Sequence, residues 1–255
     1  MNFALITGAS RGIGYELALL FAKNRHNLIL VSRHKDVLIQ LADNLSNNYK
    51  IIVLAIPIDL SHPDAAEEIF RLVLEKSISV DYLVNNAGFY VKGAFSETSW
   101  EDEQKMIQLQ CITYSQLTKL FLPGMLERGM GRILNICSTG SFVPGPYNAV
   151  YCAAKSFVLS FSEALSEEVR GTGVTVTALC PGGTKTAFQD FTKRRKSFFF
   201  PVMDASMVAK IGYEALMKGK RVVIPGMANK MQVFLIRFIP RNLVTRLIGM
   251  KNNHL

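Results

Sequence analysis

A regular alternation of two sequence patterns limits this chain to very few folds. Short runs of β-branched and aliphatic residues predict seven strands, at residues 3–6, 27–31, 51–58, 82–84, 132–136, 174–179 and 221–224. Stretches with apolar residues at about the 3.6-residue helical period predict helices over residues 12–25, 65–76, 100–128, 147–169 and 205–217. Strands covered by helices in this way form a buried parallel sheet. The chain is therefore predicted to be an α/β protein with a doubly wound, seven-stranded parallel sheet and helices on both faces.

A glycine-rich turn follows the first predicted strand and opens the first predicted helix. Residues 7–14 read Thr-Gly-Ala-Ser-Arg-Gly-Ile-Gly. Glycines allow a tight turn and a close approach of the backbone to a pyrophosphate at the positive end of a helix. The spacing is not G-x-G-x-x-G, so the position after strand one carries the argument for a Rossmann-type dinucleotide site. The candidate cofactor residues in this turn are Gly8, Ser10, Arg11, Ile13 and Gly14.

The end of the second predicted strand indicates which dinucleotide is bound. An acidic residue at this point would accept a hydrogen bond from the 2′-hydroxyl of NAD, but the chain has Val31-Ser32-Arg33. A guanidinium can bind a 2′-phosphate through two hydrogen bonds, and Arg11 would add a second positive charge. We therefore predict NADP(H) as the cofactor, with NAD(H) as the alternative. The other interpretation is that both arginines are simply solvated.

Several further motifs follow in order after the turn at 7–14. They are Asp59-Leu60, Asn85-Asn86-Ala87-Gly88, Ser138, Tyr151-x-x-x-Lys155 and Pro181-Gly182-x-Thr184-x-Thr186. With this series the chain resembles the short-chain dehydrogenase/reductase superfamily, in particular its NADP-preferring ketoreductases, over about residues 3–226. The resemblance implies that Asp59 and Leu60 border the adenine. It places Asn86, Ala87 and Gly88 beside the ribose and nicotinamide. It assigns the carboxamide and pyrophosphate to Pro181, Gly182, Thr184 and Thr186.

The candidate catalytic residues are Ser138, Tyr151 and Lys155. Tyr151 and Lys155 are four residues apart on a predicted helix, so they share one face. A nearby ammonium stabilises a phenolate, and we expect Lys155 to lower the pKa of Tyr151 toward its working range. Tyr151 would then exchange a proton with the substrate oxygen, Ser138 would polarise that oxygen, and Lys155 would also hold the nicotinamide ribose. A Y-x-x-x-K pair alone is also common on surface helices, and Ser138 at a strand end favours the catalytic interpretation.

Gln110 departs from the family pattern. The superfamily usually has an asparagine here, which helps to keep a water molecule in the proton relay behind the lysine. Glutamine is one methylene longer and could hold the water through its side chain or main chain. We expect a weakened relay with catalysis retained, and Gln110 is included among the candidate catalytic residues.

The substrate pocket is predicted from residues 89–95, 140–147 and the long loop 183–203. These segments are rich in aromatic and apolar residues, including Phe89, Tyr90, Phe142, Val143, Tyr147, Phe188 and Phe191. They favour a small apolar carbonyl or alcohol substrate, although aromatic residues in loops also serve ordinary packing.

The C-terminal segment is predicted to be a basic amphipathic tail. We assign residues 1–226 to the dinucleotide-binding and catalytic region and residues 227–255 to a tail of the same domain, with Pro240 separating two short helices. One interpretation is contact with an anionic membrane or a lid over a lipid-like substrate. The favoured interpretation is that the apolar face packs on its own domain or on a neighbouring subunit.

Composition limits partners and compartment. The formal net charge of +9 favours anionic partners. Only residues 193–196 followed by residues 198–200 hint at nucleic acid, and a basic loop is the preferred interpretation, so no nucleic-acid partner is expected. Cysteines at 111, 137, 152 and 180 form no C-x-x-C pair, so we expect no metal site and buried thiols in a reducing compartment. The N-terminus lacks a signal-peptide pattern, no apolar stretch is long enough to span a bilayer, and a cytoplasmic protein is expected.

These features predict an NADPH-dependent oxidoreductase that interconverts a ketone or aldehyde and an alcohol. A non-catalytic NADP(H)-binding regulatory or scaffold protein is the alternative, with Gln110 as its only support. A structural protein of the lipid surface would leave the glycine turn unexplained. The resemblance also implies a homodimer or homotetramer built on the helices at 100–128 and 147–169.

Overall fold

A seven-stranded parallel sheet forms the centre of the computed structural model, which describes residues 2–186 and 202–253. Its strand order is β3-β2-β1-β4-β5-β6-β9, and every neighbouring pair is parallel. The strands are β1 (Phe3–Thr7), β2 (Asn27–Val31), β3 (Val53–Ile56), β4 (Val80–Asn85), β5 (Gly131–Ile136), β6 (Val174–Leu179) and β9 (Val222–Val223). The predicted fold class is confirmed.

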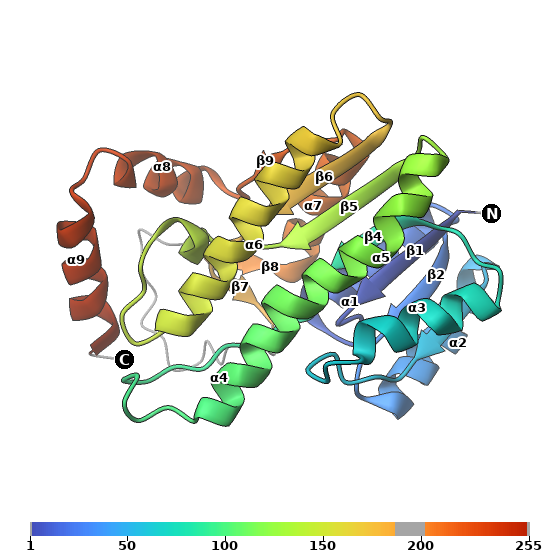
Figure 1. The fold of residues 1–255 in the computed structure, drawn as a ribbon, viewed down its shortest axis with the longest axis horizontal. Coiled ribbons are helices and arrows are strands. Elements are labelled where there is room, and N and C mark those ends of the chain that lie inside the picture. Colours follow the sequence, from blue (N-terminus) through green and yellow to red (C-terminus); the bar gives the residue numbers. More distant parts are fainter. Residues whose placement is uncertain (1, 187–201, 254–255) are drawn as a thin grey trace.

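Helices cover both faces of the sheet (Figure 1). One face carries α1 (Gly12–Lys23), α2 (Lys35–Tyr49) and α7 (Ala205–Met217). The other carries α3 (Ala65–Glu75), α5 (Tyr114–Glu127), which continues α4 (Trp100–Ile107), and α6 (Ala149–Glu168). Successive residues of a strand point to opposite faces, so Leu5 packs in one core cluster and Ile6 in the other. Both layers of the core are thus built from alternate residues of the same strands.

Helix α2 and the helical region at 100–128 differ from the sequence prediction. Helix α2 was not predicted, because its few buried apolar residues, such as Leu38 and Leu45, are separated by many polar ones. The helix predicted over 100–128 contains a π-helical turn, η1 (Gln108–Thr113), between α4 and α5. Such π-helical turns inside α-helices are frequent at functional sites.

The predicted loop at 183–203 begins and ends in short strands. β7 (Thr184–Lys185) pairs in parallel with β8 (Met203–Asp204) as a separate small sheet. Phe188, Phe191, the basic residues 193–196 and the aromatic residues 198–200 lie outside the described residues.

The tail folds as two helices, α8 (Met227–Ile236) and α9 (Arg241–Asn253), with Pro240 between them as predicted. Figure 1 shows both at the end of the molecule opposite to the N-terminus. Among residues 2–186 and 202–253, no helix has the length and apolar character needed to cross a membrane.

Candidate active site

A cleft of about 1020 Å³ opens at the carboxyl ends of the strands. It lies where the strand order reverses between β1 and β4, which is where open α/β sheets bind their ligands. The sequence-predicted residues that line it are Gly8, Ser10, Arg11, Ile13, Arg33, Asp59, Leu60, Asn86, Ala87, Gly88, Ser138, Tyr151, Lys155, Pro181, Gly182, Thr184 and Thr186. Gly14 and Gln110 do not contribute to the lining. The structure therefore brings most of the predicted residues into one cavity.

The glycine turn is clamped to the end of β4. The side-chain amide of Asn86 donates to the carbonyl oxygens of Thr7 (2.8 Å) and Gly8 (3.2 Å). The Thr7 hydroxyl accepts from the backbone N–H groups of Asn86 (2.9 Å) and Ala87 (3.1 Å). Gly8 has φ 65°, a conformation that favours glycine. Asn86 lines the cleft, as the resemblance implied, but its amide is used to hold the turn.

Gly14 packs behind the turn with no room for a side chain. A Cβ atom at this position would overlap the Gly8 carbonyl oxygen and the Asn86 amide nitrogen, and it would lie 2.9 Å from the Gly8 carbonyl carbon. The backbone of α1 can therefore approach the turn only because residue 14 is glycine.

The two candidate phosphate-binding arginines lie in the wall of the same cleft. The Ser32 hydroxyl donates to the Ser10 hydroxyl at 2.9 Å and so joins the end of β2 to the glycine turn. Arg11 and Arg33, the residues that follow these serines, both line the cleft. Burial raises the pKa of the nearby Asp59 carboxyl, but hydrogen bonds from Ser61 and the charge of Arg33 outweigh it, and the net pKa is lowered. Two guanidinium groups and the Asp59 carboxyl therefore line this part of the cleft.

Three residues from two elements form the candidate catalytic group. Ser138 follows β5 and caps the short 3₁₀ helix η2 (Thr139–Phe142), where its hydroxyl accepts from the Gly140 N–H at 3.0 Å. Tyr151 and Lys155 lie one turn apart on α6. The hydroxyl groups of Ser138 and Tyr151 are hydrogen-bonded. The predicted serine and tyrosine are thus in direct contact.

The protonation of Tyr151 differs from the sequence expectation. Burial raises the pKa of Tyr151 to about 12, and the hydrogen bond from Ser138 offsets this only in part. The expectation that Lys155 lowers this pKa is wrong for this structure, because the Lys155 ammonium donates to the Ile136 carbonyl at 2.8 Å and lies 6.0 Å from the Tyr151 ring centroid. Burial also lowers the pKa of Lys155 to about 8. At neutral pH, Tyr151 is therefore a neutral phenol that can donate a proton.

Gln110 is hydrogen-bonded to the loop that follows β4. It lies in η1 and is fully buried, and its Nε2 donates to the Phe89 carbonyl at 2.7 Å. Its Oε1 has no hydrogen-bond partner among the described residues and faces Gly88. Tyr114, which sequence reasoning missed, donates from its hydroxyl to the Ala87 carbonyl at 2.7 Å. An aromatic residue in an apolar helix reads as ordinary core, so only the structure shows that the two side chains hold this loop.

The substrate side of the cleft joins three segments. Residues 89–92 and Val143 line it, and the Gly93 N–H donates to the Tyr147 carbonyl at 3.0 Å, which connects two of the predicted pocket segments. The tail supplies Gln232, Ile248 and Asn252, which were not predicted as site residues. The positions of these residues in the amphipathic tail predict only that they are partly buried, and nothing in the sequence indicates that they line the cleft.

The four cysteines are free thiols. Cys137, Cys152 and Cys180 are buried, as expected, but Cys111 is partly exposed. Among the described ranges, no group of three or more His, Cys, Asp or Glu side chains could hold a metal ion.

Comparison with known proteins places this fold and cleft in a family. The sequence profile of the short chain dehydrogenase family matches residues 2–197, and the chain belongs to this family. It is similar to the ketoacyl reductase HetN of Nostoc sp., with 34% identity over 178 residues, 70% of this chain and 62% of that protein. It is also similar to the very-long-chain 3-oxoacyl-CoA reductase of Homo sapiens, with 34% identity over 184 residues, 71% of this chain and 58% of that protein. The chain thus spans about three fifths of the length of these curated relatives.

Solved structures of similar proteins superpose on almost the whole chain. A short-chain dehydrogenase from Sphingobium yanoikuyae in complex with NADPH has a TM-score of 0.82 and 28% identity, and the match covers 94% of this chain and 96% of that one. The structure of a 7β-hydroxysteroid dehydrogenase has a TM-score of 0.89 at 24% identity, covering 97% of this chain and 96% of that one, and shares the fold.

Proposed function

We propose that this protein is an NADPH-dependent oxidoreductase that interconverts a ketone or aldehyde and an alcohol by hydride transfer. The observation that carries the proposal is the convergence of Ser138, Tyr151 and Lys155 in one cleft whose other wall holds Arg11 and Arg33. The names of the similar reductases and the NADPH complex of the similar structure support the same class of reaction.

The residues present fit NADP(H), which supplies the hydride when bound. The turn before α1 can receive the pyrophosphate, because Gly8 and Gly12 line the cleft without side chains, adopt positive φ angles of 65° and 61°, and lie at the helix N-terminus. Arg11 and Arg33 would hold the 2′-phosphate. Asp59, Leu60, Ala87, Gly88, Pro181, Gly182, Thr184 and Thr186 line the remainder of the proposed cofactor region.

The proton chemistry follows from the environment of Tyr151. Because its pKa is about 12, Tyr151 carries its proton at neutral pH and can donate it to the carbonyl oxygen as hydride reaches the carbon. Ser138 would donate a hydrogen bond to the same oxygen and polarise the carbonyl. With a pKa of about 8, Lys155 is mostly protonated at pH 7, and its ammonium would hold the nicotinamide ribose. The arrangement favours carbonyl reduction at neutral pH.

The side chains around the reacting group support an apolar substrate. Phe89, Tyr90, Val91 and Val143 line the cleft beside Tyr151, and the Tyr90 and Tyr151 rings meet edge to face with centroids 5.9 Å apart. Pockets with apolar walls and a few convergent polar groups bind apolar ligands with a fixed orientation. We therefore propose a ketone or aldehyde with an apolar chain or ring system.

Assembly as a homodimer or homotetramer remains part of the proposal. Phe157 on α6 and Ile112 in η1 are exposed, and the Phe157 ring stacks on Phe161. Exposed aromatic and aliphatic residues on these two neighbouring helical segments support a contact between subunits.

The test is NADPH oxidation with a panel of apolar ketones and aldehydes, comparing the natural protein with Tyr151→Phe. Turnover with at least one compound, with NADPH preferred over NADH and loss of turnover in the variant, is the expected result. Tyr82→Phe is the matched control, because Tyr82 is half-buried against Phe21 and His26, outside the cleft. Tight NADPH binding without Tyr151-dependent turnover would support the alternative of a non-catalytic NADP(H)-binding regulatory or scaffold protein.

A further inference from the structure

The two tail helices and the turn between them carry many exposed large apolar side chains. On and just after α8, the exposed residues recur at helical spacing, and α9 repeats the pattern. We call this set the tail surface: Met227, Met231, Phe234, Leu235, Phe238, Leu243, Leu247 and Met250. Phe238 is 72% exposed and Phe234 is 55% exposed, although burial of such side chains is normally favourable. A soluble domain rarely leaves so many large apolar side chains together without a partner.

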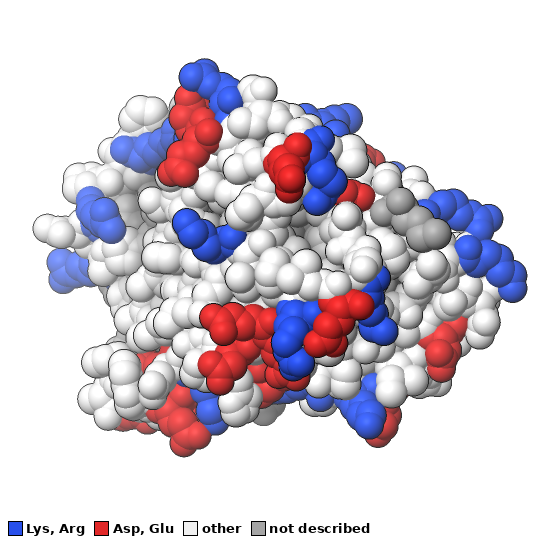
Figure 2. Space-filling model, turned by 45° about the vertical axis from the view of Figure 1, so that its right-hand side comes forward, with Lys and Arg blue, Asp and Glu red and all other residues white. Residues whose placement is uncertain are grey.

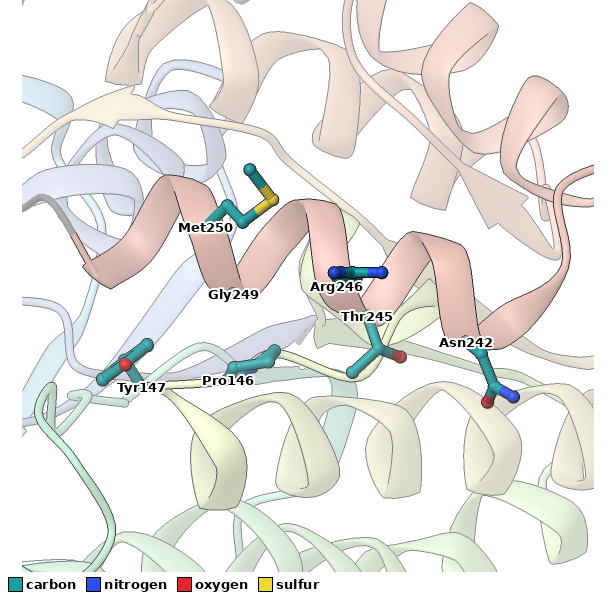
Figure 3. Close-up of a pocket in the computed structure, with 7 residues that line it drawn as sticks. All are labelled: Pro146, Tyr147, Asn242, Thr245, Arg246, Gly249 and Met250. Carbon is teal, nitrogen blue, oxygen red and sulfur yellow. The ribbon is translucent and has the colours of Figure 1, made fainter.

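The opposite sides of the same helices hold them on the domain. Val233 and Val244 are buried, and the Asn252 side chain donates to the Pro146 carbonyl at 2.9 Å. Figure 3 shows α9 passing over Pro146 and Tyr147, which line a pocket together with residues of α9. The favoured sequence interpretation was that the apolar face packs on its own domain or on a neighbouring subunit; Val233 and Val244 are buried, whereas the residues of the tail surface are exposed. One side of each helix thus packs on the domain, and the side that carries the tail surface is exposed to solvent.

The Lys, Arg, Asp and Glu residues of the tail are all of one sign. Residues 215–255 contain no Asp or Glu, and their basic residues are Lys218, Lys220, Arg221, Lys230, Arg237, Arg241, Arg246 and Lys251. On α8, on α9 and between them, Lys230, Arg237, Arg241 and Arg246 are exposed, and none forms an ion pair with another described residue. On the face drawn in Figure 2, Asp and Glu side chains lie beside Lys and Arg side chains.

We propose that the tail surface docks on an anionic lipid surface, with α8 and α9 lying in the interface. Helices that present aromatic and aliphatic residues together with Lys and Arg bind membranes in this way, by apolar burial and by attraction to anionic headgroups. A second copy of the chain fits less well. A two-fold interface would bring the same unpaired cations of both copies together, and like charges repel.

Docking would also bring the catalytic cleft next to the lipid. The same helices contribute Gln232, Ile248 and Asn252 to the cleft wall, so an apolar substrate dissolved in the membrane would meet the cleft directly. This consequence rests on the proposed function, whereas docking itself does not. Lipid binding is measured without substrate or NADPH, and turnover is measured without lipid, so either proposal can fail alone.

The experiment is sedimentation of the full chain with vesicles of phosphatidylcholine alone or with about one third phosphatidylglycerol. An apolar variant combines Phe234→Ser, Phe238→Ser and Leu247→Ser, and a charge variant combines Arg237→Gln, Arg241→Gln and Arg246→Gln. Leu74→Ser is the matched control, because Leu74 is 57% exposed on α3, outside the tail. Thermal unfolding checks that all variants fold, since the substituted side chains are exposed.

We expect binding to the anionic vesicles only, weakened by raising salt from about 0.1 to 1 M. The apolar variant should partition at least about tenfold more weakly, the charge variant about a hundredfold more weakly, and Leu74→Ser like the natural chain. Equal binding to both vesicle types, or no loss in either tail variant, would overturn the proposal. A dimer in solution that the apolar variant abolishes, without vesicle binding by the natural chain, would assign the surface to a second copy and overturn it as well.

Discussion

Gly14→Ala tests whether close packing of the glycine turn sets both stability and cofactor binding. The new Cβ would overlap the Gly8 carbonyl oxygen and the Asn86 amide, two groups that are themselves hydrogen-bonded to each other. Alanine in a helix is favoured over glycine by up to about 1 kcal/mol, but overpacking against backbone costs about 1–3 kcal/mol or more. We expect a net loss of about 2 kcal/mol in the free energy of unfolding. For a domain of this size that lowers Tm by roughly 4–8 °C.

The assay is thermal unfolding together with NADPH binding followed by fluorescence. Displacement of the Gly8 carbonyl distorts the turn, so NADPH affinity should fall at least about tenfold, which corresponds to about 1.4 kcal/mol. Gly249→Ala is the matched control, because Gly249 also lies in a helix and its Cβ would meet Pro146 at an ordinary 3.5 Å. This control should be as stable as the natural chain or more so. If Gly14→Ala matches Gly249→Ala in Tm and binds NADPH normally, the reasoning about the turn is refuted.

Three further predictions test the cofactor, the lysine and assembly. Arg33→Ala should raise the KM for NADPH about 10- to 100-fold with little change for NADH, as a charged hydrogen bond to phosphate requires; equal effects on both cofactors in steady-state kinetics would contradict this. Burial lowers the pKa of Lys155 from 10.5 to about 8, so the unfolded chain binds more protons between these values and stability rises with pH across that window. Lys155→Met removes this dependence, and urea unfolding should show a gain of about 1–3 kcal/mol at pH 7 that shrinks toward pH 10.5, with turnover lost; an unchanged slope of stability against pH would count against it. Phe157→Glu should convert an oligomer into a monomer in light scattering while the tail variants leave the assembly intact; an unchanged mass would remove α6 from the proposed subunit contact.

Sequence patterns predicted the sheet because its strands are nearly continuous apolar runs, and such runs are read directly. They missed α2, where buried residues such as Leu38 are diluted by polar ones on a half-solvated helix. They predicted one helix at 100–128 because periodicity does not register a π-helical turn such as Gln108–Thr113. Local patterns thus identify the elements that are buried most completely.

Some features of the candidate site could likewise be predicted from the sequence, and others could not. Ser138, Tyr151 and Lys155 follow from motif spacing, but the pKa of Tyr151 depends on how deeply the ring is buried and on which group the Lys155 ammonium contacts. Both depend on tertiary packing. The support that Tyr114 gives to Ala87, and the contribution of the tail to the cleft wall, likewise join segments far apart in the sequence. The identity of the candidate catalytic residues could be predicted from residue type and spacing, whereas the pKa of Tyr151 and the contacts between distant segments could not.

Transfer of the label from deuterated NADPH tests the central claim most directly. The cofactor carries deuterium at its transferable hydride position, and the product alcohol of a ketone found in the panel is analysed by mass spectrometry. The account predicts one deuterium on the carbinol carbon with the natural chain, and no labelled alcohol above background with Tyr151→Phe. Alcohol that forms without deuterium, or labelled alcohol formed equally well by Tyr151→Phe, would contradict it.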